Sequence, residues 1–259
     1  MTSTNLRPAR APRIAARILS RALSCVSALL ASIALAQSPS PSPSPAPQPP
    51  AIPEAPAASD AQVVAASVQA FYDQAKDLSA SFFQTYVNKV YQRTDRSQGR
   101  VVFKKPGMMR WDYAMPNGKV ITSNGKKVLV YEPGEDGDKG QVIEQDLANA
   151  QLPQAMSFLL GTGKLQEDFS FRLLDAAREG YAAGDVLELK PKVPTPHFER
   201  LLFYVEKTKA LRGLVRRLLI IDASGNRNRF DFSAIKFNGN VGAQVFDYTP
   251  PAGTRNVKM

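Results

Sequence analysis

The spacing of apolar and polar residues between positions 99 and 133 predicts several short antiparallel strands in succession. Val101 and Phe103 fall on one side of an extended chain. After a proline-glycine break, Met109, Trp111 and Tyr113 also share one side. Such alternation is typical of strands that bury a single face. The Asn-Gly pair that follows lies between two apolar runs and predicts a hairpin.

Two other stretches predict helices. An apolar stripe at helical spacing runs from Val64 to Leu78, and Ser59 or Asp60 is the expected N-cap. Residues 82–92 then predict a long first strand. A second helix is expected around Pro153 and should end at Gly161, because glycine is favoured at that position. The apolar side of this second helix consists of Leu152, Met156, Leu159 and Leu160.

The second half of the chain predicts strands throughout. Residues 201–205 and 218–221 are apolar at every position, so both of their faces should be covered. Between Arg229 and Phe237 the alternation shifts by one residue, which predicts a β-bulge. About ten or eleven antiparallel strands and two helices result, and they indicate a mainly β (α+β) fold with a large curved sheet.

Residues 1–36 predict a secretory signal peptide rather than a folded element. Arg7, Arg10, Arg13, Arg17 and Arg21 precede a short apolar run that ends in Ala34-Leu35-Ala36. A basic segment, a short apolar core and an A-x-A site define such signals. Cleavage after Ala36 would remove the one cysteine of the chain, so the mature protein would have no disulfide.

Residues 37–59 hold nine of the 20 prolines, together with many serines and alanines. This composition predicts an extended, disordered linker, with a proline-motif ligand as the alternative. Residues 60–259 are then one domain of ordinary size.

Charge and motifs exclude several classes of function. Without the signal the chain carries 28 Lys and Arg against 23 Asp and Glu, and the basic pairs are scattered, so no nucleic-acid partner is expected. A weak attraction to an anionic membrane surface or an acidic partner fits this charge better. His197 is the only histidine, and no nucleophile or phosphate-binding motif is present. We therefore expect no enzyme, no metal and no cofactor.

Two spaced motifs stand out in the central region. The first reads Gly99-x-x-x-Phe103-x-Lys105-Pro106-x-x-x-Arg110-Trp111-x-Tyr113-x-x-Pro116, and the second reads Ser123-Asn124-Gly125-Lys126-x-Val128-x-x-Tyr131-x-Pro133. Together with Leu78-Ser79-Ala80-Ser81-Phe82-x-Gln84-Thr85, they resemble the LolA family of outer-membrane lipoprotein carriers. The resemblance extends from Asp60 to about Pro251.

The resemblance implies an unclosed antiparallel β-barrel of about eleven strands, with helices as a lid over an apolar cavity. It implies a monomeric periplasmic chaperone that accepts lipoproteins from an inner-membrane ABC exporter and passes them to an outer-membrane acceptor. A regulatory sensor of lipid or lipoprotein, or a carrier of another lipid, is the alternative within the same superfamily.

Strand parity and the resemblance together indicate which residues bind acyl chains. The expected cavity residues are Phe82, Phe103, Met109, Trp111, Tyr113, Val130, Met156, Leu159 and Leu160. Periodicity alone also fits an ordinary core for the methionines and aromatic residues. Lys105 stands where the family has an arginine that latches the lid, and lysine keeps the charge but lacks the planar fork of donors.

Overall fold

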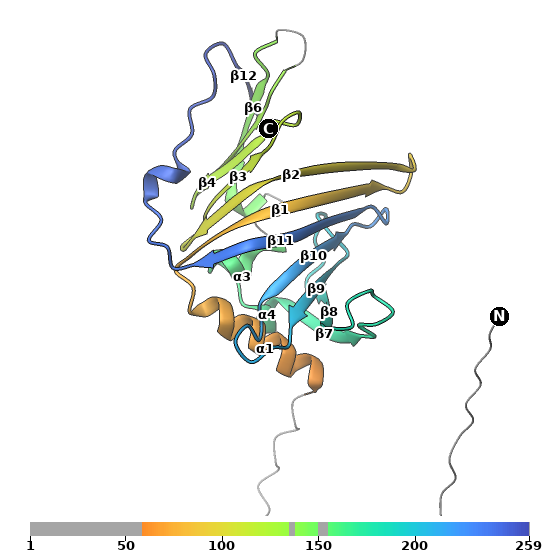
Figure 1. The fold of residues 1–259 in the computed structure, drawn as a ribbon. Helices are drawn as coiled ribbons and strands as arrows, with labels where there is room; N and C mark the ends of the chain where they lie inside the picture. Colours follow the sequence, from red (N-terminus) through yellow and green to blue (C-terminus); the bar gives the residue numbers. More distant parts are fainter. Residues whose placement is uncertain (1–58, 135–137, 150–154, 259) are drawn as a thin grey trace, which may run out of the picture. The chain divides into compact units, whose positions relative to one another are not determined.

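The computed structural model describes residues 59–134, 138–149 and 155–258. They belong to one compact unit, Ala55–Met259 (Figure 1). The expected signal peptide, almost all of the linker, and Leu152 and Pro153 lie outside the described residues.

One sheet of 12 strands forms the body of this unit, in the order β12-β6-β5-β4-β3-β2-β1-β11-β10-β9-β8-β7. The strands are β1 (Asp77–Asn88), β2 (Arg93–Lys104), β3 (Met108–Tyr113), β4 (Val120–Asn124), β5 (Lys127–Glu132), β6 (Gln141–Asp146), β7 (Phe169–Leu174), β8 (Gly184–Pro191), β9 (Arg200–Glu206), β10 (Val215–Ile221), β11 (Arg227–Phe237) and β12 (Arg255–Lys258). Because β12 and β7 are the two ends of this order, the sheet does not close into a barrel.

The expected architecture is confirmed, with one strand more than the sequence predicts. All neighbours are antiparallel except β12, which pairs with β6 in parallel. The antiparallel prediction is wrong here because residues 238–254 return across β3 and β4 before β12 pairs. On that path the backbone carbonyls of Val245 and Phe246 accept hydrogen bonds from Arg110 Nη1 (3.0 Å) and Thr122 Oγ1 (2.8 Å).

Helix α1 (Asp60–Asp73) begins at the predicted N-cap. The Ser59 hydroxyl accepts from Gln62 N, and the Gln62 side chain accepts from Ser59 N, so both groups of a capping box are present. The sequence places the first strand at 82–92, but β1 begins at Asp77, and Leu78 belongs to this strand rather than to the helical stripe. The other helices among the described residues are short: η1 (Leu147–Asn149), α3 (Ser157–Leu160), α4 (Leu165–Asp168) and η2 (Ala243–Phe246). No described helix is long and apolar enough to cross a membrane.

The main apolar core lies on one face of the sheet, which we call the inner face. It contains the apolar side of α1 and buried residues of nearly every strand, among them Phe103, Trp111, Phe203 and Phe230. On the opposite, outer face a smaller cluster joins Leu202 and Tyr204 of β9 to Leu219 and Ile221 of β10. The prediction that both faces of these two strands are covered is thus confirmed.

The predicted bulge in β11 is present. Ser233 pairs with Ser81, whereas Lys236 pairs with Ser79, so Ala234 and Ile235 together oppose Ala80. Ala234 has a positive φ of 49°. Because the bulge adds one residue, the side chains after it change face, and Ile235 lies on the inner face together with Phe232.

Gly99 lets β2 pass close to β1 and β3. A Cβ atom at this position would lie 2.1 Å from the carbonyl oxygen of Asp112 and 2.9 Å from the Phe82 ring. We predict that Gly99→Ala lowers the free energy of unfolding by about 1–3 kcal/mol, because the backbone and ring must move apart. Urea denaturation measures this change. Gly239→Ala is the control, since its Cβ would meet nothing nearer than 3.7 Å. Equal midpoints for the two variants would contradict the prediction.

Candidate functional site

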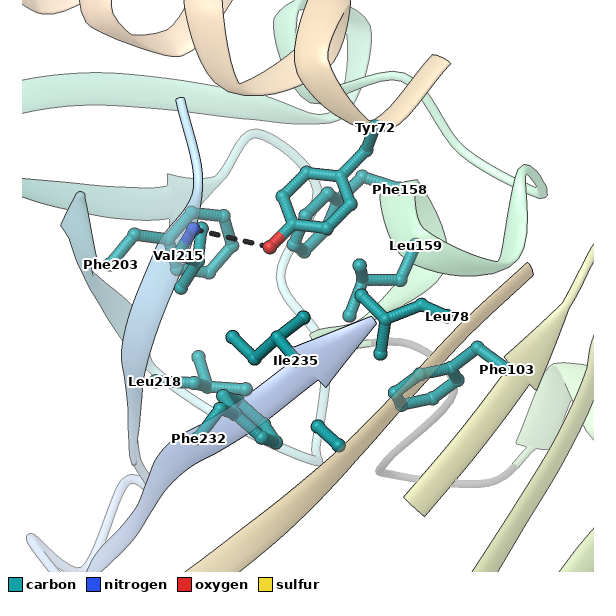
Figure 2. A pocket seen from close by; sticks show the side chains of 11 residues that line it. Tyr72, Leu78, Phe103, Phe158, Leu159, Phe203, Val215, Leu218, Phe232 and Ile235 are labelled. Atoms are coloured by element: carbon teal, nitrogen blue, oxygen red, sulfur yellow. Dashed lines mark hydrogen bonds between the residues drawn. The ribbon is translucent and has the colours of Figure 1, made fainter. Parts of the chain in front are cut away.

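An apolar cavity lies between the inner face of the sheet and the helices α1 and α3, which we call the lid. Figure 2 shows its side chains directed toward one another from both sides. The lining residues are Tyr72 of α1, Leu78 and Ala80 of β1, Phe103 of β2, Phe158 and Leu159 of α3, Phe203 of β9, Val215 and Leu218 of β10, and Phe232 and Ile235 of β11. Apart from one tyrosine hydroxyl, every lining side chain is apolar.

The cavity is almost closed. Inside this lining there is about 10 Å³ of room for the centre of a water-sized sphere, which is enough for about one water molecule. A wall with a single hydroxyl offers such a water too few hydrogen-bond partners, so the space is suited to apolar groups. Anything larger than a water molecule requires the lid to move.

Tyr72 connects the lid to the far half of the sheet. Its hydroxyl accepts a hydrogen bond from the backbone N–H of Val215 at 3.1 Å (Figure 2). Its ring packs edge-on against Phe158, with centroids 5.0 Å apart. Burial raises the pKa of Tyr72 well above its ordinary value, more than the bond from Val215 and the charge of Arg216 lower it. The hydroxyl is therefore neutral at physiological pH.

Lys105 connects the lid to the other half of the sheet. Its Nζ donates to the backbone carbonyl of Tyr72 at 2.8 Å, in the last turn of α1, where carbonyls lack helical partners. Burial lowers the pKa of the Lys105 ammonium, and the nearby Asp73 carboxylate partly opposes this shift. The sequence assigns a latch to Lys105, and its hydrogen bond to Tyr72 joins it to the lid; its role as a latch stays a prediction.

The turn around Lys105 also holds α3. Gly107 N donates to the carbonyl of Leu160 at 3.0 Å. Gly161 ends α3 in the left-handed conformation (φ 67°), as the sequence predicts. A Cβ on Gly161 would lie 3.0 Å from Cδ of Lys105, so this glycine leaves room for the lysine stem.

An aromatic layer borders the cavity on the side of β3. The Trp111 ring lies 5.7 Å from Phe103 and 6.3 Å from Phe232, and both of these residues line the cavity. Trp111 is fully buried, and its Nε1 is among the described buried atoms that have no hydrogen-bond partner. An N–H left in this way costs free energy, which an acceptor brought by a ligand would recover.

Of the nine residues expected at the site, some line the cavity and the others belong to the core around it. Phe103 and Leu159 line the cavity, while Val130 is half-buried and packs against the same core. The remaining six, Phe82, Met109, Trp111, Tyr113, Met156 and Leu160, are buried in the surrounding core. In this closed form they support the lining, and their part in binding acyl chains stays a prediction.

Sequence reasoning missed most of the lining, namely Tyr72, Leu78, Ala80, Phe158, Phe203, Val215, Leu218, Phe232 and Ile235. Some of these carried a usable signal. Leu78 and Ala80 share the parity of Phe82, and Tyr72 stands in the apolar stripe of α1. The residues of β9, β10 and β11 showed only that they were apolar, since nothing local indicates which strands face the lid.

An open sheet whose inner face encloses an apolar cavity under helices defines a class of lidded, unclosed half-barrel proteins. The family model described as "Outer membrane lipoprotein carrier protein LolA" matches residues 73–249. The chain belongs to this family, which confirms the resemblance in its motifs.

Relatives named outer-membrane lipoprotein carrier protein align over most of the domain. The one from Nitrosomonas europaea is 29% identical over 187 residues, covering 72% of this chain and 85% of the relative. The one from Pseudomonas aeruginosa is 30% identical over 185 residues, covering 70% and 81%. Among solved structures, a LolA superfamily protein from Nitrosomonas europaea aligns with a TM-score of 0.42 at 15% identity, over 74% of this chain and 99% of that one.

The Tyr72 hydroxyl provides a direct test of the lid geometry. Tyr72→Phe leaves the buried N–H of Val215 without its acceptor, so we predict that the free energy of unfolding falls by about 1–3 kcal/mol. Thermal and urea melts measure the loss. Tyr131→Phe is the control, because Tyr131 is also buried but its hydroxyl has no bond to a described residue. A loss equal to that of the control would show that the bond to Val215 does not hold the lid.

Proposed function

We propose that this protein is a periplasmic chaperone that carries lipoproteins from the inner to the outer membrane with their acyl chains in the inner cavity. The observation that carries this proposal is the apolar lining enclosed between the sheet and a lid formed by two helices. Family membership supports it, and the signal-like N-terminus supports export. An inner-membrane ABC exporter would supply the cargo and an outer-membrane acceptor would take it. One chain supplies the whole lining, so a monomer suffices.

The cost of exposing acyl chains explains why such a carrier is needed. Burial of each methylene is worth about 0.8 kcal/mol, so three long chains in water cost on the order of tens of kcal/mol. A lipoprotein therefore cannot cross an aqueous compartment without a cover. The cavity supplies an apolar cover made by the inner face of a single domain.

The cavity, which its own lining almost fills, supports a carrier that binds its cargo weakly. Loading must separate the lid from the sheet, which breaks the contacts of Tyr72 with Val215 and of Lys105 with the end of α1. Part of the free energy gained by burying acyl chains is lost in this opening. When the cargo leaves, the lid can close on its own lining instead of exposing it, and release becomes easier.

Substitution of Lys105 tests whether this side chain latches the lid. Lys105→Leu removes a charge-assisted hydrogen bond of a half-buried side chain, so we predict a loss of about 1 kcal/mol in unfolding free energy. Its larger effect should be on cargo, with transfer of a lipoprotein from donor to acceptor membranes slowed severalfold. Lys105→Arg is the matched control, because arginine keeps the charge and adds donors. Equal transfer rates for all three proteins would show that residue 105 is not a latch.

Acyl-chain entry can be followed at Trp111, the single tryptophan of the chain. We predict that a triacylated lipopeptide changes Trp111 emission, because Phe103 and Phe232 separate this ring from the cavity by only one layer. Leu159→Asp places a carboxylate at the half-buried edge of the lining and should weaken lipopeptide binding at least tenfold.

Leu211→Asp is the matched control for this experiment. Leu211 is also partly buried against the core, but it does not line the cavity. If the lipopeptide leaves the emission unchanged, or if both variants bind it equally, the inner cavity is not the acyl-chain site. Titration with a phospholipid in place of the lipopeptide shows whether another lipid is carried.

A further inference from the structure

The turn between β1 and β2 exposes an unusual pair of apolar side chains. Val90 and Tyr91 are 69% and 80% exposed and adjacent in sequence. Isolated exposed apolar residues are common on soluble proteins, and Val193, which is 79% exposed, is one of them. Two neighbours at the end of a hairpin form a small patch that points outward.

This turn, which we call the hairpin tip (residues 88–93), projects beyond the neighbouring strand. β1 and β2 pair out to Asn88 and Arg93, but β2 and β3 pair only as far as Gly99 and Tyr113. The loop after β3 still bonds to Gln98 and Ser97, so the part of β2 that extends past it lies before Ser97 and is roughly 13 Å long at about 3.3 Å per residue. On the other side, β11 pairs with β1 as far as Val87. Figure 1 shows β1 and β2 as long arrows that this turn joins.

The hairpin tip is held in place by hydrogen bonds. The Asn88 side-chain oxygen accepts from Tyr91 N at 3.0 Å, and the Asn226 side-chain oxygen accepts from Lys89 N at 2.9 Å. The Lys89 stem lies against Gly225 of the next turn, where a Cβ would be 3.1 Å from its Cδ. The apolar pair is thus presented by an ordered support.

Cations surround the hairpin tip. Arg93 pairs with Asp95 at 2.8 Å, whereas Lys89, Arg96 and Arg227 form no ion pair with any described residue. Arg96 and Arg227 share the outer face, because their partners Thr85 and Val87 on β1 have the same parity.

Two carboxylates line hollows next to these cations, and one of them, Glu179 beside Arg227, forms no ion pair with a described residue. Glu199 lines the same hollow as Lys89 and Arg227, and it is 4.0 Å from Arg200. Three unpaired cations and an exposed Val-Tyr pair therefore stand together at one end of the sheet.

We propose that the hairpin tip docks on the surface of an anionic phospholipid bilayer. Val90 and Tyr91 enter the interface, where tyrosine is favoured, and Lys89, Arg96 and Arg227 face the lipid phosphates. A projecting tip suits a fluid interface, which closes around it, better than a rigid protein partner, which would need a matching pocket. This surface is separate from the inner cavity, so the proposal does not depend on what the cavity holds.

Vesicle sedimentation of the purified protein tests the proposal, with phosphatidylglycerol–phosphatidylcholine vesicles compared with pure phosphatidylcholine. We expect binding to the anionic vesicles only, and weaker binding at high salt. Each cation contributes about a fivefold change in partition, so Lys89→Gln, Arg96→Gln and Arg227→Gln together should reduce binding by about 100-fold. Val90→Ser with Tyr91→Ser should reduce it at least tenfold.

Matched controls remove the same number of charges and of exposed apolar side chains from other parts of the surface. Lys126→Gln, Lys139→Gln and Lys209→Gln remove three exposed cations from other turns, and Val63→Ser with Val193→Ser removes two exposed apolar side chains elsewhere. These controls should bind within about twofold of the wild type. Equal losses in test and control variants would show that binding depends on net charge rather than on the hairpin tip, and would overturn the proposal. Absence of binding to anionic vesicles, or binding only to an acidic polypeptide, would also overturn it.

Discussion

An unclosed sheet has an apolar inner face that only another element can cover, and here one residue ties the covering helix to the sheet at two points. Tyr72 fixes α1 at two points, through its hydroxyl to Val215 of β10 and through its carbonyl to Lys105 after β2. These two strands lie on opposite sides of β1 and β11 in the strand order. A single turn of helix therefore crosses the inner face above β1 and β11, and the burial of Phe158 and Phe103 depends on that crossing.

Much of the β-sheet was predictable because its signals are local. Alternation placed Val101, Phe103, Met109 and Trp111 on the inner face, and Gly161 ends α3 in the conformation that only glycine adopts easily. The start of β1 was missed because Leu78 also fits the helical spacing that begins at Val64, which obscured its alternation with Ser79. The short β12 was missed because pairing, rather than its own composition, makes it a strand.

The cavity itself was less predictable than the fold. Its lining is assembled from seven different elements, and the bond from Val215 to Tyr72 joins residues 143 positions apart. Parity says which face a side chain takes, but not which part of that face lies under a helix. The aromatic run of β3 was therefore correctly assigned to the inner face, yet Trp111 lies one layer outside the lining.

The bulge in β11 has a consequence for how this strand can change over time. Phe232 and Ile235 both reach the cavity although three positions separate them, and Phe237 reaches the Phe71 ring at 5.1 Å. Only the extra residue at Ala234 makes these spacings compatible. Loss of one residue here would turn Ile235 and Phe237 outward together, whereas exchange of one side chain would leave the register intact. The strand is thus free to vary in composition but constrained in length, and insertions should accumulate in the turns around it instead.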